Sequence, residues 1–271
     1  MMSRPSVRWS SAVCAAAVVL ATVMAGCAGI PDAAPGPDIK TASDQTNADR
    51  AAQARLELAA GYFANGQLTT ALDEIKRVLE FRPDLPEALN LRGLIYASMG
   101  QPALAETSFR RALAFAPRDG DVMHNFGWFL CQQQRYGEAD TQFSAALALP
   151  QYRSFGRTLL AQGACQARAG QLHRADATLS RAFELDPSNV VVAYNLTEVL
   201  YRLGEFERAR FYIRRVNSRR ETANAQSLWL AARVENRLGN ADQVRQLGDE
   251  LRQRFPQSPQ VLLYDKRRFD E

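Results

Sequence analysis

The chain has 271 residues, enough for one or two globular domains, and 46% of them are hydrophobic, an ordinary share for a folded protein. The formal net charge of only +4 argues against nucleic acid as the main partner. The four cysteines, at positions 14, 27, 131 and 165, form neither a dense disulfide framework nor a CxxC metal motif.

The first 26 residues resemble a bacterial export signal. A basic start is followed by the apolar run 12–24, which is short for a bilayer span. The run ends in the motif Met-Ala-Gly-Cys at 24–27, and small residues before a cysteine resemble the lipobox of bacterial lipoproteins. We therefore predict that residues 1–26 are a lipoprotein signal peptide and that Cys27 is lipidated. The alternatives are an ordinary signal peptide or an N-terminal membrane anchor.

The residue after the predicted lipidated cysteine is Ala28 rather than aspartate. By resemblance to Gram-negative lipoproteins, this predicts sorting to the outer membrane, with the protein facing the periplasm. Residues 27–51 are rich in Pro, Gly, Ala and Asp and show no apolar period, so we predict a flexible tether there.

A pattern with a period near 34 residues runs through most of the remaining chain. A small residue recurs in steps of 34, 34, 36 and 34 residues, and a bulky apolar residue follows it four positions later. This period is that of tetratricopeptide repeats, so the chain resembles a tetratricopeptide-repeat (TPR) protein. The small column is Ala71, Ala105, Ala139, Ala175 and Ala209, and the bulky column is Ile75, Phe109, Phe143, Leu179 and Ile213.

Each repeat is predicted to form two short helices, and such a hairpin buries its apolar face only against neighbours of the same kind. The resemblance predicts an all-α fold, a right-handed superhelical solenoid of about six TPR hairpins, followed by a capping tail at 259–271. The sixth repeat fits least well, because Gly248 lies in mid-helix. The predicted repeats are about 52–85, 86–119, 120–153, 156–189, 190–223 and 225–258.

The TPR resemblance also implies that the first helix of each hairpin lines a concave groove for a partner. The residues at the groove positions here are unusually aromatic and apolar, which is typical of a surface that binds an extended peptide or an amphipathic helix. The alternative is that some of these rings pack between repeats. The predicted partner-binding residues are Phe63, Asn90, Leu94, His124, Trp128, Leu160, Arg168, Tyr194, Tyr201, Arg202, Trp229 and Arg233.

The basic segment 208–220 could contact anionic lipid head groups or an acidic protein. We favour a solvated helix face balanced by Glu205, Glu207 and Glu221.

Metal and thiol chemistry is sparse. His124 and Cys131 lie on one helix face, but two ligands do not make a metal site, so we predict no metal. Cys131 and Cys165 occupy nearly equivalent places in adjacent repeats. Because neighbouring first helices should lie about 8–10 Å apart, we expect these cysteines to be unbridged, although the periplasm would permit a disulfide.

The arrangement of a lipidated cysteine, a short tether and six TPRs resembles the type IV pilus biogenesis lipoproteins of the PilF/PilW kind, the pilotins. The segment Asn125–Cys131, with the sequence NFGWFLC, is similar to an NxGxFLC-type segment of that family. The resemblance implies a protein that helps the outer-membrane secretin of the pilus machine to localise and assemble. It implies a protein partner and a lipid anchor, with no cofactor, nucleic acid or small-molecule substrate.

Two other functions remain open at this stage. The first is a TPR lipoprotein adaptor for cell-wall enzymes or for outer-membrane protein assembly. The second is a periplasmic enzyme, which the absence of GxSxG, HExxH, P-loop and GxGxxG motifs disfavours. We therefore predict a non-enzymatic scaffold.

Overall fold

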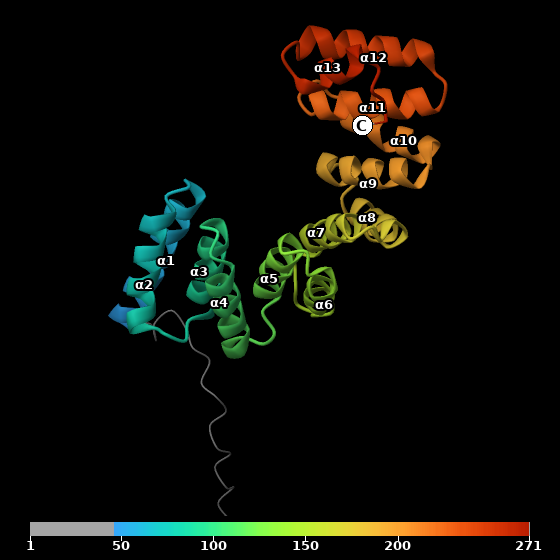
Figure 1. Ribbon diagram of the computed structural model, residues 1–271. Coiled ribbons are helices and arrows are strands. Elements are labelled where there is room, and N and C mark those ends of the chain that lie inside the picture. Colours follow the sequence, from blue (N-terminus) through green and yellow to red (C-terminus); the bar gives the residue numbers. More distant parts are fainter. Residues whose placement is uncertain (1–45, 271) are drawn as a thin grey trace, which may run out of the picture. The chain divides into compact units, whose positions relative to one another are not determined.

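Helices alternate with tight turns throughout the computed structural model, which describes residues 46–270 (Figure 1). Thirteen helices and no strands are present in that range. The predicted signal peptide, Cys27 and most of the tether lie outside the described residues. The helices are α1 (Asn47–Ala64), α2 (Leu68–Phe81), α3 (Pro86–Ser98), α4 (Pro102–Phe115), α5 (Gly120–Gln132), α6 (Tyr136–Leu147), α7 (Phe155–Arg168), α8 (Leu172–Leu185), α9 (Val190–Leu203), α10 (Phe206–Asn217), α11 (Ala225–Arg237), α12 (Ala241–Arg254) and α13 (Pro259–Asp265).

The first helix begins earlier than the sequence pattern predicts. Residues 47–51 were assigned to the tether, but they form the first turns of α1. Thr46 and Asp49 form a capping box, and the Asp49 carboxylate also pairs with Arg82 at the end of α2. The prediction was wrong because it relied on the apolar columns, which start inside the helix, and not on the cap that precedes them.

In the second, third and fourth hairpins, a glycine on the first helix faces a bulky side chain on the second. A methyl group added at Gly127 would lie only 2.9 Å from the ring of Phe143. Gly93 and Gly163 meet Phe109 and Leu179 in the same way. The bulky column therefore fills the space that the missing side chains leave, and Phe109, Phe143 and Leu179 are fully buried.

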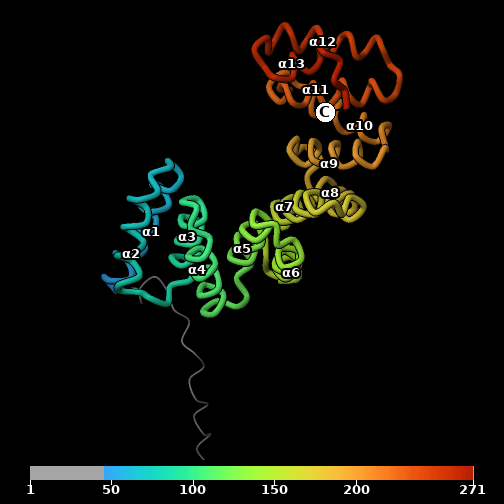
Figure 2. Tube along the Cα trace, in the orientation of Figure 1, coloured from blue at the N-terminus to red at the C-terminus, as the bar shows by residue number. Residues whose placement is uncertain are grey.

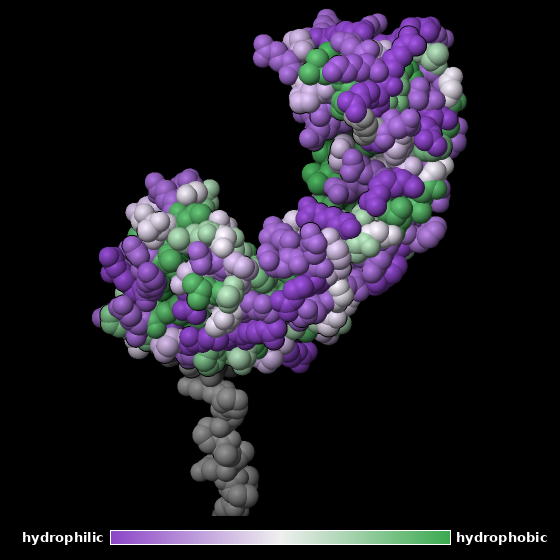
Figure 3. Space-filling view, in the orientation of Figure 1, coloured by the Kyte–Doolittle hydropathy of each residue, from purple (hydrophilic) through white to green (hydrophobic). Residues whose placement is uncertain are grey.

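Successive hairpins stack because each first helix packs against both helices of the preceding hairpin. Within the described range, α3 contacts α5, α5 contacts α7 and α7 contacts α9, whereas no second helix packs against the next second helix. The first helices therefore lie on the inner side of the curved row of hairpins that Figures 1 and 2 show. The space-filling view shows a hollow on that inner side (Figure 3). This concave face is where the predicted groove residues belong.

The turn inside each hairpin needs a left-handed backbone residue. Glycine supplies it in five hairpins, at Gly66, Gly100, Gly170, Gly204 and Gly239, with φ between 70° and 80°. The third hairpin has Gln134 in this role, with φ 60°. The turn geometry is therefore kept even where the glycine column is interrupted.

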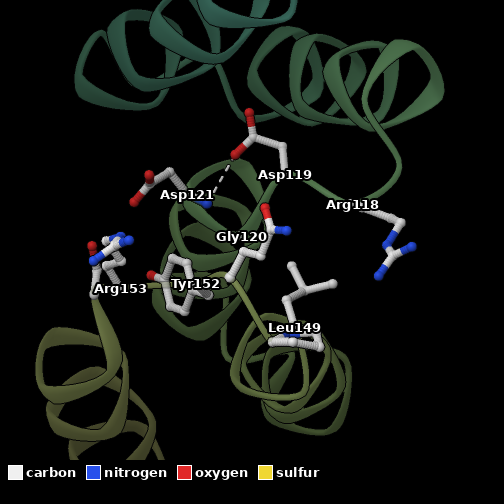
Figure 4. A pocket seen from close by; sticks show the side chains of 10 residues that line it. Arg118, Asp119, Gly120, Asp121, Leu149, Tyr152 and Arg153 are labelled. Carbon is white, nitrogen blue, oxygen red and sulfur yellow. Dashed lines mark hydrogen bonds between the residues drawn. The ribbon is translucent and has the colours of Figure 1, made fainter.

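The two extra residues between the third and fourth repeats form a loop that anchors Tyr152. The aromatic ring packs against Gly120 at the start of α5, in space that a side chain there would occupy (Figure 4). Tyr152 is buried, and its hydroxyl hydrogen-bonds with Thr158 Oγ1 at 2.7 Å. The insertion thus fixes α5 to the beginning of α7 rather than loosening the stack.

The C-terminal helix α13 packs on α11 and α12. The ring of Tyr264 lies where a side chain at position 248 would project, which explains the glycine in mid-helix. Arg252 pairs with Asp265 at 2.6 Å and holds the other side of α13. Val261 is buried against this end of the stack, whereas Leu262 is exposed. Within residues 46–270, no helix combines the length and the apolar composition that a bilayer span requires.

Candidate partner-binding surface

The middle of the concave face contains an open pocket of about 500 Å³ between α5, α7 and α9. Five predicted groove residues lie in its lining: His124, Trp128, Leu160, Arg168 and Arg202. They come from three consecutive first helices, because each hairpin repeats the same inward-facing positions. The structure therefore brings together residues that are up to 78 positions apart in the sequence.

Trp128 and Arg168 form the centre of this surface. The guanidinium of Arg168 lies 5.1 Å from the centre of the Trp128 ring, within the range of a cation–π interaction. Trp128 is half-buried and Arg168 is exposed. Tryptophan and arginine are the residues that most often dominate binding energy in protein interfaces.

The pocket carries an excess of positive charge. Its lining includes Arg157, Arg168 and Arg202, against the single carboxylate of Glu198. Arg157 pairs with Asp121 at 2.8 Å, and Arg202 donates a hydrogen bond to the carbonyl of Ala167 at 2.9 Å.

Glu198 is engaged with the neighbouring Tyr194, which donates a hydrogen bond to it at 3.1 Å. Burial, reinforced by the charge of Glu198, raises the pKa of Tyr194 well above its usual range, so the phenol stays protonated as a donor. The accessible arginines therefore dominate the electrostatics of the pocket.

His124 contributes a buried polar group beneath the pocket. Its Nδ1 lies 2.9 Å from Thr158 Oγ1, which links it to Tyr152. Burial is the main cause that lowers the pKa of His124 to about 4, and the charge of Arg157 adds to it. The imidazole is therefore neutral near pH 7. In the described part of the chain, no group of three His, Cys, Asp or Glu side chains is placed to hold a metal ion.

Cys131 and Cys165 form a disulfide, contrary to our prediction. It joins α5 to α7, and the two Cα atoms are 5.8 Å apart. The prediction used the distance between helix axes, whereas Cα atoms on facing sides of two helices are closer than the axes by twice the helix radius. The bridge lies within the same pair of helices that carries Trp128 and Arg168.

The predicted residues at the C-terminal end of the groove are covered by the chain itself. Trp229 is only 6% exposed, and its ring stacks on Phe269 with centroids 5.2 Å apart. Arg233 Nε and the Tyr201 hydroxyl both donate to the carbonyl of Phe269, at 3.0 and 3.3 Å. Figure 2 shows the C-terminal end of the chain beside α11. Sequence reasoning missed this contact because Phe269 lies outside every repeat column.

The remaining predicted groove residues do not line the pocket. Phe63 and Leu94 are half-buried against the core of the first two hairpins, which fits the alternative of packing between repeats. Asn90 accepts a hydrogen bond from Asn125 at 3.2 Å. Tyr194 packs against the core between α9 and α11. These residues stabilise the stack.

Half of the six arginines in the basic segment 208–220 pair with acidic groups, namely Arg208, Arg210 and Arg214. Arg208 pairs with Asp176 at 2.9 Å and with Glu205 at 2.6 Å. Arg214 reaches the buried Glu235 at 3.1 Å. Arg215 lies over the ring of Phe183. This pattern favours the balanced helix face over a separate docking site.

A second cavity, of about 590 Å³, lies where the Tyr152 loop meets the start of α5 (Figure 4). Asp119 faces it, but its carboxylate accepts the backbone N–H groups of Asp121 and Val122 as a helix cap. The cavity therefore presents chiefly structural groups, and the pocket between α5 and α9 is the better candidate.

Comparison with known proteins agrees with the repeat architecture. The profile described as TPR repeat matches residues 61–100, and profiles described as tetratricopeptide repeat match residues 86–119 and 166–228. The type IV pilus assembly protein PilF of Pseudomonas aeruginosa is 26% identical over 210 residues, covering 78% of this chain and 83% of PilF. The chain is a TPR protein homologous to PilF.

Solved structures extend the likeness to three dimensions. The crystal structure of PilW, described as a widely conserved type IV pilus biogenesis factor, superposes with a TM-score of 0.73 at 29% identity. The superposition covers 78% of this chain and 96% of PilW. The structure of Pseudomonas aeruginosa PilF gives a TM-score of 0.72 at 25% identity, covering 82% of this chain and the whole of PilF. The TPR solenoid predicted from the sequence is thereby confirmed.

Proposed function

We propose that this protein is a non-enzymatic, lipid-anchored scaffold of type IV pilus biogenesis, which binds protein partners through its concave face and promotes secretin assembly. The homology with PilF carries the proposal, because it spans most of both chains. The open, tryptophan-containing pocket between α5 and α9 supports a binding role. No cofactor is needed for this role beyond a covalent lipid.

Membrane attachment is part of the proposal. Removal of residues 1–26 would leave Cys27 at the new N-terminus, where a diacylglyceryl group and an amide-linked chain together would anchor the protein stably in the outer membrane. Cys27→Ser should therefore release the protein into the soluble periplasmic fraction. Cys14→Ser is the matched control and should stay in the membrane. Retention of the Cys27 variant after a salt wash would contradict the lipid anchor.

The function itself is tested by secretin assembly in a deletion strain. Membranes run on a gel without boiling separate the secretin ring from its monomer. We expect the ring to be lost and to return with the wild-type gene. An unchanged ring would overturn the proposed role and would favour the adaptor for cell-wall enzymes or outer-membrane protein assembly.

The same strain tests whether the concave face is used. Trp128→Ala should restore the ring less well than Phe115→Ala, which removes a half-exposed aromatic ring from the second helix α4. Equal restoration by the two variants, at equal protein levels, would remove the pocket from the proposal.

A further inference from the structure

The C-terminal tail, which follows α13 as a short turn segment, shows which side chains of this concave face hold a stretch of polypeptide. After α13 the chain crosses to α11 and presents Phe269 and Asp270 to the inner side of the stack. The Phe269 ring stacks on Trp229, and its carbonyl accepts from Arg233 and Tyr201. The Asp270 carboxylate lies 3.7 Å from the guanidinium of Arg237. An aromatic ring followed by a carboxylate is thus bound by aromatic and arginine side chains.

The same kinds of side chain recur one and two repeats earlier. Arg168, Arg202 and Arg237 follow one another at steps of 34 and 35 residues and occupy equivalent places near the ends of α7, α9 and α11. Arg237 faces the tail, whereas Arg168 and Arg202 line the open pocket. Trp128 supplies the aromatic surface there, with Leu160 beside it.

The two upstream arginines contact the protein only through uncharged groups, Arg202 through the Ala167 carbonyl and Arg168 through the Trp128 ring. Among the ion pairs of residues 46–270, neither Arg168 nor Arg202 has an acidic partner, and both side chains are exposed. Glu198 is the single acidic residue of the lining and is bonded to Tyr194. A cationic pocket with an aromatic base is complementary to an acidic, aromatic ligand.

We propose that the pocket between α5, α7 and α9 binds an extended segment of a partner protein in which an aromatic residue is followed directly by an acidic one. The aromatic ring contacts Trp128 and Leu160, and the carboxylate pairs with Arg168 or Arg202. The chain's own Phe269-Asp270 occupies the adjoining stretch of the same face with the same chemistry. This inference rests on the proposed scaffold function and gives it a ligand class.

The test is a binding titration of the full chain in detergent with a fluorescein-labelled peptide, Gly-Ser-Ser-Phe-Asp-Ser-Ser-Gly. Two control peptides carry Asn for Asp or Ala for Phe. Because one control lacks the charge-assisted pair and the other lacks the stacked ring, we expect each control to bind about tenfold more weakly. Saturation by fluorescence anisotropy gives the affinities, and added salt should weaken the binding of the Phe-Asp peptide.

Protein variants locate the site. Arg168→Gln and Trp128→Ala should each lower the affinity for the Phe-Asp peptide about five- to tenfold, and both variants should retain the helical circular dichroism signal. Arg181→Gln, an exposed arginine on the second helix α8, is the matched control and should bind normally.

Three results would overturn the inference: no saturation up to about 1 mM peptide, equal affinity for the Phe-Asp and Phe-Asn peptides, or unchanged affinity in both pocket variants. If Phe269→Ala alone strengthened binding while Trp128→Ala had no effect, the peptide would be replacing the tail, and the open pocket would be excluded. Failure of this titration leaves the secretin-ring experiment unaffected. Failure of the proposed scaffold function would appear as an unchanged ring in the deletion strain, even if the peptide bound.

Discussion

The middle and the C-terminal end of the concave face are built from the same kinds of residue, but the middle is open to solvent and the C-terminal end is covered. In the middle, Trp128 is half-buried and lines an open pocket together with Arg168. At the C-terminal end, Trp229 is 6% exposed because Phe269 covers it. A groove position in a repeat protein therefore predicts the direction of a side chain, whereas the accessibility of that side chain depends on which other segments of the chain pack against it.

The two regions are also held by different means. A disulfide joins α5 to α7 in the middle, whereas the C-terminal tail is held by packing, hydrogen bonds and an ion pair. A covalent link limits the relative movement of two repeats. The non-covalent cover can be removed by single substitutions.

The largest effect is expected from removing the disulfide. Replacing both Cys131 and Cys165 by serine should lower the free energy of unfolding by about 3–4 kcal/mol, because the bridge closes a 34-residue loop in the unfolded chain. Chemical denaturation of the variant and of the wild type measures the loss. Reduced wild-type protein should match the variant, and equal midpoints for oxidised and reduced wild type would contradict the prediction.

A smaller effect should open the C-terminal end. Gly248→Ala places a methyl group against the rigid ring of Tyr264 and should displace α13 and the tail, costing about 1–2 kcal/mol even after the gain in helix propensity. Hydrogen exchange in residues 259–270 should rise, and Trp229 should become accessible to a fluorescence quencher.

Gly61→Ala in α1 is the matched control for this change. Nothing lies within 4 Å of a methyl group at that position, so the substitution should be neutral or stabilising. If Gly248→Ala had the same effect on stability as Gly61→Ala and left hydrogen exchange in the tail unchanged, the packing of Tyr264 would not be the contact that holds α13 in place.

A pH-dependent effect of similar size on the free energy of unfolding is expected from His124, in the middle of the concave face. The pKa of His124 is about 4 in the folded protein, below its ordinary value of 6.5, so the unfolded chain takes up this proton first as the pH falls. The contribution to stability is therefore complete above about pH 6.5 and is lost progressively toward pH 4. Between pH 7 and pH 5 the wild type should lose roughly 1–2 kcal/mol through this group.

Substitution separates this effect from the titration of carboxylates. His124→Gln should show a flatter dependence of unfolding free energy on pH over that range, because it removes the titrating group while keeping a polar side chain near Thr158. His173→Gln changes an exposed residue of α8 and should follow the wild type. Identical pH profiles for all three proteins would contradict the prediction.

The smallest effect concerns the turn between α5 and α6. Gln134 adopts φ 60°, where the other hairpins have glycine, and Gln134→Gly should relieve that conformation. We expect stabilisation of about 0.5–1 kcal/mol, since the gain exceeds the added entropy of the unfolded chain. A thermal melt detects it, and destabilisation would show that the glutamine side chain has a role that offsets its backbone cost.

Much of the architecture could be predicted from the sequence because each hairpin is specified by local contacts. The columns headed by Ala71 and Ile75, together with the turn glycines, predict helix pairs and their order without knowledge of distant contacts. The inward direction of Trp128, Leu160 and Arg168 follows from the same repeat positions. The cap at Thr46 also has a local signal, although the column pattern overlooked it.

Other features depend on residues that lie apart in the sequence or outside the repeats. The Cys131–Cys165 bridge requires facing Cα atoms 5.8 Å apart, a distance that the average spacing of helix axes does not reveal. The position of Tyr152 against Gly120 depends on the conformation of an irregular loop, which the repeat pattern does not specify. The covering of Trp229 by Phe269 arises because the tail, which belongs to no repeat, crosses back over α11.

The repeat unit, the order of the hairpins and the inward-facing helix can all be predicted from the amino-acid pattern, because they follow from periodic packing between neighbours. The open part of the concave face, the part that the tail covers and the covalent link between α5 and α7 become visible only in the folded chain. The physical reason is that accessibility and bridging depend on the absolute positions of a few side chains, which a repeating pattern leaves unspecified.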